Sequence, residues 1–314
     1  MAKPAVAITM GDPLGIGPEI VIKSMAHIEV FEVCKPIIVG SRSILKKAAE
    51  LQNLVETYEK VEESIVDVYT EENITQKAAG KAAFEYINKA VSLCMDKRTD
   101  AIATAPINKE HLKEANIPYI GHTEILAGLT NTDDPLTMFE TDSLRIFFLS
   151  RHVSLIEACN LVKKERIYQY ISRCDNALKK LGVDKGTMAV AALNPHSGEG
   201  GMFGREEIEE IIPAVNMAKT DGIDVVGPIS ADSVFHLAHI GRYNSVLSMY
   251  HDQGHIASKT MDFEGTISLT IGLPFLRTSV DHGTAMDIAW KGIANERSMV
   301  EAILVAAKYA PKYN

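Results

Sequence analysis

Residues 250–295 read YHDQGHIASKTMDFEGTISLTIGLPFLRTSVDHGTAMDIAWKGIAN. A core segment would not carry so many polar groups, because each buried polar group needs a partner. A disordered tail would not carry the β-branched segment 266–271. We therefore expect loops at the ends of strands that hold a charged ligand. The polar residues concerned are His251, Asp252, His255, Lys259, Arg277, Asp281 and His282.

The chain on either side alternates short apolar segments with helical ones. Strands are expected at 5–9, 36–40 and 100–105, and helices at 41–51, 75–95 and 205–218, the last of them amphipathic. This alternation is typical of an α/β fold in which helices cover a largely parallel sheet. In such sheets, ligands bind beyond the carboxyl ends of the strands.

Composition limits the function classes. A chain of 314 residues is too long for one simple core, so two α/β domains or lobes are expected. Its net charge of −9 predicts no nucleic-acid or membrane partner. The four cysteines show no C-x-x-C spacing, which argues against a disulfide framework or a zinc ribbon. Without a signal-peptide core or a membrane-length apolar run, a cytoplasmic location is expected.

Two segments have the form of a loop that leads into a helix. GDPLGIGPE at 11–19 could present backbone N–H groups to an anion, or could be a tight turn that needs glycine for steric reasons. It is neither a G-x-G-x-x-G nor a P-loop motif. In GHTE at 121–124, His122 and Thr123 could bind an anion, or Thr123 could simply cap the helix.

Three expected strands end at a histidine: LRIFFLSRH at His152, AVAALNPH at His196 and VLSMYH at His251. One histidine after a strand is more often structural, but three at equivalent places could converge on a divalent cation. Three imidazoles leave coordination positions open for a substrate. A second set, which could bind carboxylate or phosphate, comprises Lys259 and Arg277 together with His122 and Thr123.

The segment HGTAMDIAWKGIAN at 282–295 resembles the loop that wraps the adenosine half of the nicotinamide cofactor in isopropylmalate and isocitrate dehydrogenases. The acidic position of that loop takes the ribose hydroxyls and matches Asp287, which favours NAD over NADP. The resemblance implies cofactor contacts at His282, Gly283, Thr284, Ala285 and Asp287.

A closer resemblance covers nearly the whole chain. The motifs ITMGDPLGIGPE, ATAPINK, GHTE, NPHSGEGG, GP-x-x-AD-x-x-F, YHDQG and GLPFLRTSVDHGTA occur in this order. Together they resemble the 4-hydroxythreonine-4-phosphate dehydrogenase family of pyridoxal phosphate biosynthesis, which includes D-threonate and D-erythronate 4-phosphate dehydrogenases. This resemblance implies a homodimer in which His152, His196 and His251 bind one divalent cation (zinc, magnesium, manganese or cobalt), with one ligand from the partner subunit.

The resemblance also implies an isocitrate/isopropylmalate dehydrogenase-like fold of two α/β/α lobes with a cleft. The expected cofactor-side lobe comprises 1–128 and 262–314, and the metal- and dimer-side lobe comprises 129–261. The implied reaction is NAD- and metal-dependent oxidation, with decarboxylation, of a 4-phosphorylated hydroxy acid. The first candidate substrate is 4-hydroxy-L-threonine 4-phosphate, and D-threonate and D-erythronate 4-phosphates are alternatives.

Substrate contacts are implied for His122, Thr123, Lys259 and Arg277. Ser268 is added because it stands where the family usually has Asn. Arg151 stands where the family usually has Thr, before the first metal-binding histidine. Both departures bear on the identity of the substrate, although Arg151 could also face outward because neighbouring strand side chains alternate.

The general base stays open among Lys259, Asp232 and Asp252. A metal-dependent aldolase or lyase could use the same cation and anion sites without NAD. A two-lobed binding protein would need neither a cation nor turnover.

Overall fold

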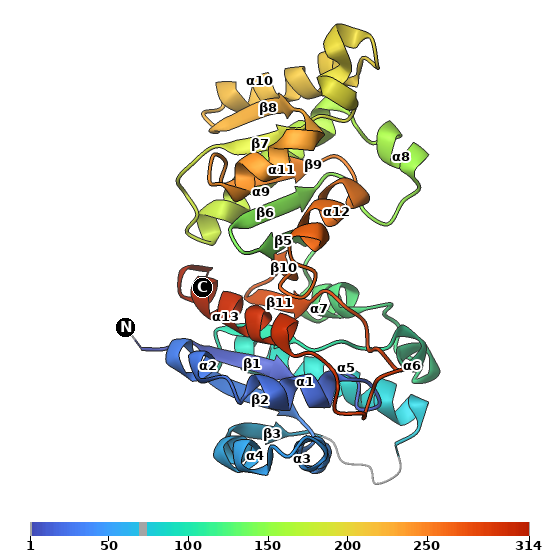
Figure 1. The fold of residues 1–314 in the computed structure, drawn as a ribbon, viewed down its shortest axis with the longest axis vertical. Coiled ribbons are helices and arrows are strands. Elements are labelled where there is room, and N and C mark those ends of the chain that lie inside the picture. The colour runs from blue at the N-terminus through green and yellow to red at the C-terminus, as the bar shows by residue number, and fades with distance from the viewer. Residues whose placement is uncertain (1, 69–73, 314) are drawn as a thin grey trace. The chain divides into compact units, whose positions relative to one another are not determined.

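The computed structural model describes residues 2–68 and 74–313 (Figure 1). The chain divides into two compact units: unit 1 is Met1–Pro135 with Ile267–Asn314, and unit 2 is Leu136–Thr266. Both divisions lie a few residues beyond the boundaries expected near 128 and 262. Thr266 belongs with unit 2, where its hydroxyl lies 2.7 Å from the hydroxyl of Thr141.

The strands of unit 1 lie in the order β3–β2–β1–β4–β11–β10. Neighbours are parallel except for β10 and β11, which are antiparallel. Their bounds are β1 Ala5–Thr9, β2 Lys35–Gly40, β3 Ile65–Asp67, β4 Ala101–Thr104, β10 Ile267–Ile271 and β11 Leu276–Val280. The α/β fold with a largely parallel sheet is confirmed.

The helices of unit 1 pack closely where small residues permit it. A Cβ atom at Gly80 in α5 would lie 1.9 Å from the carbonyl oxygen of His111 in α6, so only glycine fits at this crossing. The helices are α1 Gly17–Ser24, α2 Ile28–Val33, α3 Arg42–Leu51, α4 Val55–Val61, α5 Gln76–Met95, α6 Lys109–Glu114, α7 His122–Thr130 and α13 Arg297–Tyr313, with a 3-10 turn η1 at Glu62–Ser64.

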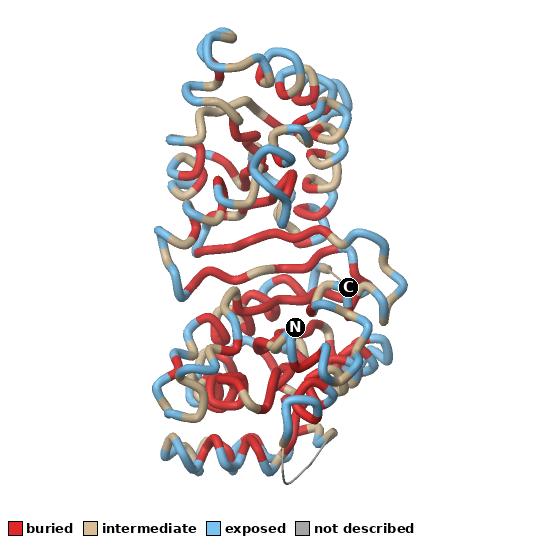
Figure 2. The backbone as a smooth tube through the Cα atoms, turned by 90° about the vertical axis from the view of Figure 1, so that its right-hand side faces the viewer, coloured by how far each residue is buried: buried red, intermediate tan, exposed pale blue. Residues whose placement is uncertain are grey.

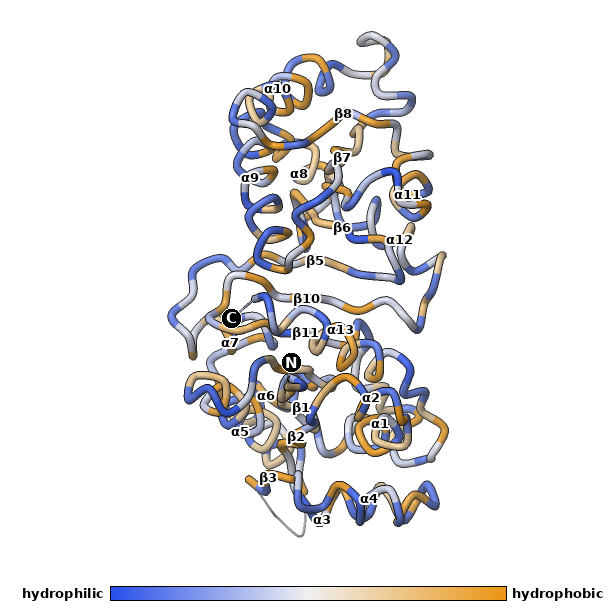
Figure 3. The backbone as a smooth tube through the Cα atoms, turned by 90° about the vertical axis from the view of Figure 1, so that its left-hand side faces the viewer, coloured by the Kyte–Doolittle hydropathy of each residue, from blue (hydrophilic) through white to orange (hydrophobic). Residues whose placement is uncertain are grey.

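The strands of unit 2 lie in the order β5–β6–β9–β7–β8, and only β5 and β6 are antiparallel. Their bounds are β5 Leu136–Thr141, β6 Leu144–Phe148, β7 Met188–Ala191, β8 Val225–Ile229 and β9 Ser245–Ser248. Figure 2 shows the central strands of each unit buried. In Figure 3, β5 and β8 are largely hydrophobic, whereas α9 alternates between hydrophobic and hydrophilic, as expected for a helix with one buried face.

The helical elements of unit 2 include one irregular region. The segment expected to be one amphipathic helix from 205 to 218 is instead a π-helical turn followed by α10, with Pro213 in the first turn of α10. The elements are α8 Leu155–Asn160, α9 Lys164–Lys180, η2 Pro195–Gly201, η3 Glu207–Ile211, α10 Ile212–Thr220, α11 Ala231–His239 and α12 His251–Met261. Among the described residues, no helix is long and apolar enough to cross a membrane.

Candidate functional site

Arg277 lies on β11 within the sheet of unit 1, and only 5 % of the residue is exposed. The strand register places Thr270 of β10 directly opposite Arg277. Ser279, two residues further along β11, is paired with Ser268 of β10 and with Thr104 of β4. Because alternate residues of a strand share a face, these side chains form one polar stripe across three adjacent strands.

The guanidinium of Arg277 is buried, and its hydrogen-bond partners are neutral hydroxyls. Its Nε and Nη2 donate to the Thr104 hydroxyl at 3.0 and 2.8 Å, and its Nη1 donates to the Thr270 hydroxyl at 3.1 Å. No described carboxylate forms an ion pair with it. Burial lowers the pKa of Arg277 to about 9, partly opposed by the charge of Glu124. A buried cation without a counter-ion is costly, so this position is suited to receive an anion.

His122 is the first residue of α7, beside this cation. The N-cap is Gly121, which supplies no side-chain hydrogen bond, so Thr123 lies inside the helix and the capping alternative for Thr123 is wrong. The Nε2 atom of His122 is buried and has no hydrogen-bond partner among the described residues. Burial, and then the charge of Arg277, holds the pKa of His122 well below its ordinary value. A neutral imidazole, a helix N-terminus and a buried guanidinium are therefore brought together in an arrangement whose chemistry suits an anion.

The glycine-rich loop at 11–19 packs against other segments of the chain. Gly11 has φ of 75°, and a Cβ atom there would lie 2.4 Å from the carbonyl oxygen of Pro106. The backbone N–H of Ile16 donates to the carbonyl of Thr284 at 3.1 Å. The tight-turn interpretation therefore accounts for Gly11, and the loop lies against the segment that follows β11.

Buried Glu19 holds the segment 281–295 in place. Its carboxylate accepts from the backbone N–H of Trp290, and from that of Gly292 at 2.7 Å. The indole N–H of Trp290 donates to the carbonyl of Pro13 at 3.1 Å. Both carboxylate oxygens are satisfied, so the buried charge is used to fix a loop more than 270 residues away in sequence.

The residues expected to contact a cofactor lie on this segment. Thr284 is buried, whereas Gly283 and Asp287 are exposed. Ala285 has φ of 42°, the left-handed region that a residue with a side chain rarely adopts. The Nδ1 atom of His282 donates to the carbonyl of Gly283 at 3.0 Å. The segment therefore combines a fixed backbone with an exposed acidic group.

In unit 2, the predicted metal ligands follow neighbouring strands. The strands β6, β9 and β7 are adjacent and parallel, so their carboxyl ends lie at one edge of the sheet. His152, His251 and His196 follow β6, β9 and β7 respectively. This register explains how residues almost 100 positions apart come to the same edge.

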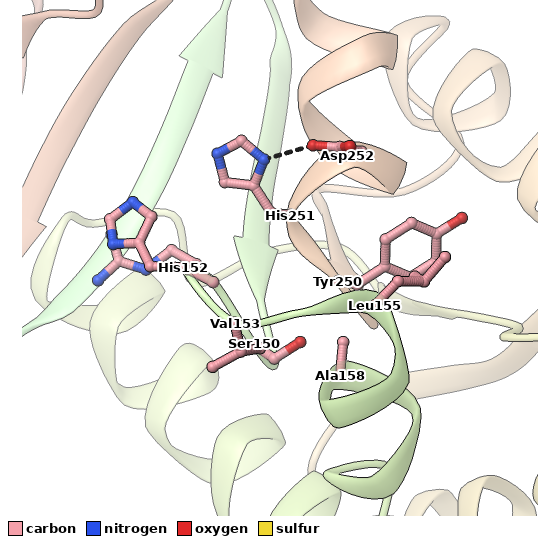
Figure 4. Close-up of a pocket in the computed structure, with 9 residues that line it drawn as sticks. Ser150, His152, Val153, Leu155, Ala158, Tyr250, His251 and Asp252 are labelled. Carbon is pink, nitrogen blue, oxygen red and sulfur yellow. Dashed lines mark hydrogen bonds and ion pairs between the residues drawn. The ribbon is translucent and has the colours of Figure 1, made fainter.

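A pocket of about 210 Å³ lies at this edge (Figure 4). The ring centroids of His152 and His251 are 6.0 Å apart. The Nδ1 of His251 donates to the Asp252 carboxylate at 2.7 Å, which leaves Nε2 for another partner. The pocket is lined by Ser150, Arg151, His152, Val153, Leu155, Ala158, Tyr250, His251 and Asp252.

Two of the three histidines have a strained backbone. His152 has φ of 43° and His196 has φ of 51°. Such strain is concentrated at functional sites. The loop of His196 is held by buried Glu207, whose carboxylate accepts from the backbone N–H groups of Leu193 and Asn194 at 2.9 and 2.8 Å. Among the described residues of one chain, no group of three or more His, Cys, Asp or Glu is arranged to hold a metal ion.

The candidate general bases differ in their positions. Asp252 lines the pocket, whereas Asp232 is exposed in the first turn of α11 and does not line it. Lys259 is half-buried in the last turn of α12, where its Nζ lies 4.7 Å from the centroid of the Phe263 ring.

Comparison with known proteins shows the family of this chain. The model of the family described as pyridoxal phosphate biosynthetic protein PdxA matches residues 32–306. The chain belongs to the PdxA family. A curated relative from Clostridium botulinum, 56 % identical over 99 % of this chain and 98 % of its own length, is named "Putative D-threonate 4-phosphate dehydrogenase". A relative from Halalkalibacterium halodurans has the same name, identity and coverage.

Solved structures of PdxA-type enzymes have the same fold. The 4-hydroxythreonine-4-phosphate dehydrogenase of Klebsiella pneumoniae is 38 % identical, with a TM-score of 0.85 over 98 % of this chain and 100 % of the other. That of Burkholderia phymatum is 37 % identical, with a TM-score of 0.83 over 98 % and 99 %. This PdxA-family chain is thus an oxidoreductase of the 4-phosphorylated hydroxy-acid dehydrogenase type.

Four buried positions in this PdxA-family chain were not among the residues predicted from sequence. They are Thr104, Thr270, Glu19 and Glu207. Thr104 and Thr270 lie within apolar segments of the sequence. Only the register of the strands shows that they share a face of the sheet with Arg277. The proline and glycines around Glu19 indicated a loop, but no local pattern indicates which backbone a carboxylate will bind.

Proposed function

We propose that this PdxA-family enzyme oxidises a 4-phosphorylated hydroxy acid with NAD and a divalent cation, with decarboxylation of the product. The observation that carries the proposal is Arg277, a buried guanidinium whose hydrogen-bond partners are threonine hydroxyls. A phosphate or carboxylate on the substrate would supply the missing counter-ion, and a planar guanidinium suits either group.

Each side chain in the anion-binding arrangement has a separate proposed role. Arg277 supplies charge, and the N-terminus of α7 supplies backbone N–H groups to the same anion. Burial and the charge of Arg277 hold the pKa of His122 well below its ordinary value, so the imidazole is proposed to be neutral when an anion arrives. It can then donate a hydrogen bond through Nε2, which is otherwise without a partner in the described chain. Thr123 and Ser268 are proposed to add hydroxyl contacts, and Lys259, on α12 of unit 2, is proposed as a further contact to the substrate.

The donor set at the unit 2 pocket fits a divalent cation. His251 has one nitrogen bound to Asp252, an arrangement that orients the other nitrogen toward a metal. His152 and His196 are the other proposed ligands, with one ligand supplied by a second copy of the chain in a homodimer. A bound cation would act as a Lewis acid on the substrate hydroxyl. Asp252, Asp232 and Lys259 remain the candidates to accept the hydroxyl proton.

The segment 281–295 fits the adenosine half of NAD. The exposed carboxylate of Asp287 suits ribose hydroxyls and would repel a 2′-phosphate, which favours NAD over NADP. A Cβ atom at Gly283 would meet nothing within 4 Å, so the backbone there is open to a ligand. Contacts are proposed at His282, Gly283, Thr284, Ala285 and Asp287.

Two substrates are supported about equally. The K. pneumoniae structure is named for 4-hydroxythreonine 4-phosphate, whereas the C. botulinum relative is named for D-threonate 4-phosphate. The first substrate carries an ammonium group where the second carries a neutral hydroxyl. Following NADH formation with 4-hydroxythreonine, D-threonate and D-erythronate 4-phosphates tests the proposal. Cation-dependent turnover of any one of them supports it, and no NADH from all three contradicts it.

Arg151 is expected to disfavour the substrate that carries the ammonium group. It lines the same pocket as His152 and His251, and two like charges about 4 Å apart in water repel by about 1 kcal/mol, or roughly fivefold. Arg151→Thr should therefore raise kcat/KM for 4-hydroxythreonine 4-phosphate relative to D-threonate 4-phosphate by roughly fivefold. Arg173→Thr, on α9 outside the pocket, is the control. An unchanged ratio in the Arg151 variant would exclude this role.

Glu19→Gln is expected to weaken NAD binding by about tenfold without changing cation affinity. The amide can accept only one of the two backbone hydrogen bonds, and a hydrogen bond to a charged group contributes about 1.5–3 kcal/mol. Trp290, the single tryptophan of the chain, lies in the affected segment, so its fluorescence reports NAD binding directly. Glu50→Gln, an exposed acid on α3, is the matched control. NAD affinity equal to that of this control would show that the segment does not bind the cofactor.

A further inference from the structure

The motif HDQGH at 251–255 forms the first five residues of α12, and the structure indicates a role for four of them. His251 and Asp252 line the pocket. The Gln253 side chain accepts from the backbone N–H of Met249 and donates to the carbonyl of Ala192, both at 2.7 Å, so it ties β9 to the end of β7. Gly254 lets the helix approach β6, because a Cβ atom there would lie 2.6 Å from the Phe148 ring. His255 is the remaining residue.

His255 stacks on His251. Their ring centroids are 3.9 Å apart and the planes differ by 21°. Residues four apart lie on the same face of a helix, one turn from each other. Two aromatic side chains of the unit 2 core also pack near His255, with ring centroids of Phe139 at 4.3 Å (interplanar angle 63°) and of Phe148 at 5.2 Å. His255 thus connects the core of the unit to the proposed metal ligand.

The hydrogen bond from His251 to Asp252 is not sufficient to fix the imidazole by itself. The side chain of Asp252 is 72 % exposed, so water competes for that bond. A hydrogen bond also restrains the direction of Nδ1 more than the tilt of the ring. A stacked ring restrains the tilt, because rotation of His251 would break the face-to-face contact.

We propose that His255 is a positioning residue that fixes the plane of the His251 imidazole, so that Nε2 of His251 is oriented for a divalent cation before the cation arrives. This inference rests on the proposed cation-binding role of His251. Preorganisation of this kind raises affinity because the ligand loses less rotational freedom on binding.

The test compares two substitutions that differ in the presence of a ring. His255→Phe keeps a flat ring on His251, whereas His255→Leu keeps an apolar side chain without one. Binding of Mn²⁺ and Co²⁺ to the full-length protein is measured by calorimetry, and the Co²⁺ visible spectrum reports the ligand geometry. We expect His255→Leu to weaken binding by about tenfold or more, the effect typical of residues that orient a ligand, and to alter the Co²⁺ spectrum. His255→Phe should stay within a few-fold of wild type.

The test includes a matched control variant, and two outcomes would contradict the inference. His236→Leu, an exposed histidine on α11, should change neither measurement. The inference is wrong if His255→Leu binds cations as wild type does, or if His255→Phe binds as weakly as His255→Leu. If the wild-type protein binds no cation, the proposed function is contradicted, and not the role of His255 alone. A structural role for His255 predicts a lower melting temperature with an unchanged Co²⁺ spectrum.

Nuclear magnetic resonance provides a test that needs no substitution of His255. Because the two ring centroids are 3.9 Å apart, ring-current shielding by His255 is expected to shift the Hε1 resonance of His251 upfield of the corresponding resonance of exposed His236. The His251 resonance is assigned from the spectrum of His251→Gln. The absence of an upfield shift in the wild-type protein would show that the two rings do not stack in solution.

Discussion

Arg277→Met is expected to abolish most turnover while leaving the protein at least as stable as wild type. The substitution removes a buried charge that has no described ion-pair partner, and replacing buried charge with an apolar side chain of similar size is often neutral or stabilising. The hydroxyl of Thr104, one of its two acceptors, keeps the hydrogen bond that it donates to the carbonyl of Thr278 at 3.3 Å. A residue that only supports the fold would show the opposite result, a clear loss of stability.

The loss of function should be large because two charge-assisted hydrogen bonds to the substrate disappear. At about 1.5–3 kcal/mol each, their removal corresponds to roughly a 10²–10⁴-fold lower kcat/KM. Arg277→Lys keeps the charge but not the planar fork, so an intermediate loss is expected. The melting temperature and kcat/KM are measured on the same preparations. A destabilised Arg277→Met variant with near-normal kcat/KM would contradict the proposed anion site.

The same site predicts a pH dependence with a definite sign. The protonated guanidinium is the form that binds an anion, and burial lowers the pKa of Arg277 to about 9. The pH profile of kcat/KM reports the free enzyme, in which no anion yet opposes this effect. The kcat/KM of wild type should therefore fall above about pH 9, and in Arg277→Met this part of the profile should be flat.

His251→Ala is expected to remove the cation and the activity together. It deletes one of three proposed imidazole ligands, so the loss should exceed the roughly 10–100-fold that follows removal of an orienting partner. Asp252→Asn, which leaves the ligand but weakens the hydrogen bond that orients it, should fall within that smaller range. Metal content after dialysis and calorimetric titration with Zn²⁺, Mg²⁺, Mn²⁺ and Co²⁺ measure both effects, with His236→Ala as the control.

The rival functions give different results in this experiment. A metal-dependent aldolase or lyase would lose the cation with His251→Ala, but the wild-type protein would form no NADH. A binding protein that needs no cation would keep its ligand affinity in His251→Ala. Retention of a tightly bound cation by this variant would show that the metal lies elsewhere and would exclude the proposed role of the three histidines.

Much of the fold could be predicted from local patterns. The α/β class followed from alternating strands and helices, and the motif order indicated the family. The placement of the three histidines after strands could also be predicted, because polar residues that end an apolar segment are visible in the sequence itself. The irregular start of the helix after 205 could not, because an amphipathic pattern does not distinguish an α-helix from a π-helical turn.

By itself, the sequence determined which side chains are available at the ends of strands, because strand ends are defined by local hydrophobicity and by glycine and proline. The tertiary structure alone decided which of these side chains meet. Arg277 acquires Thr104 from a strand 173 positions away, and Glu19 reaches Trp290 across 271 positions. Such pairs depend on strand order and register, which arise when the whole sheet packs, and no local stretch of residues contains that information.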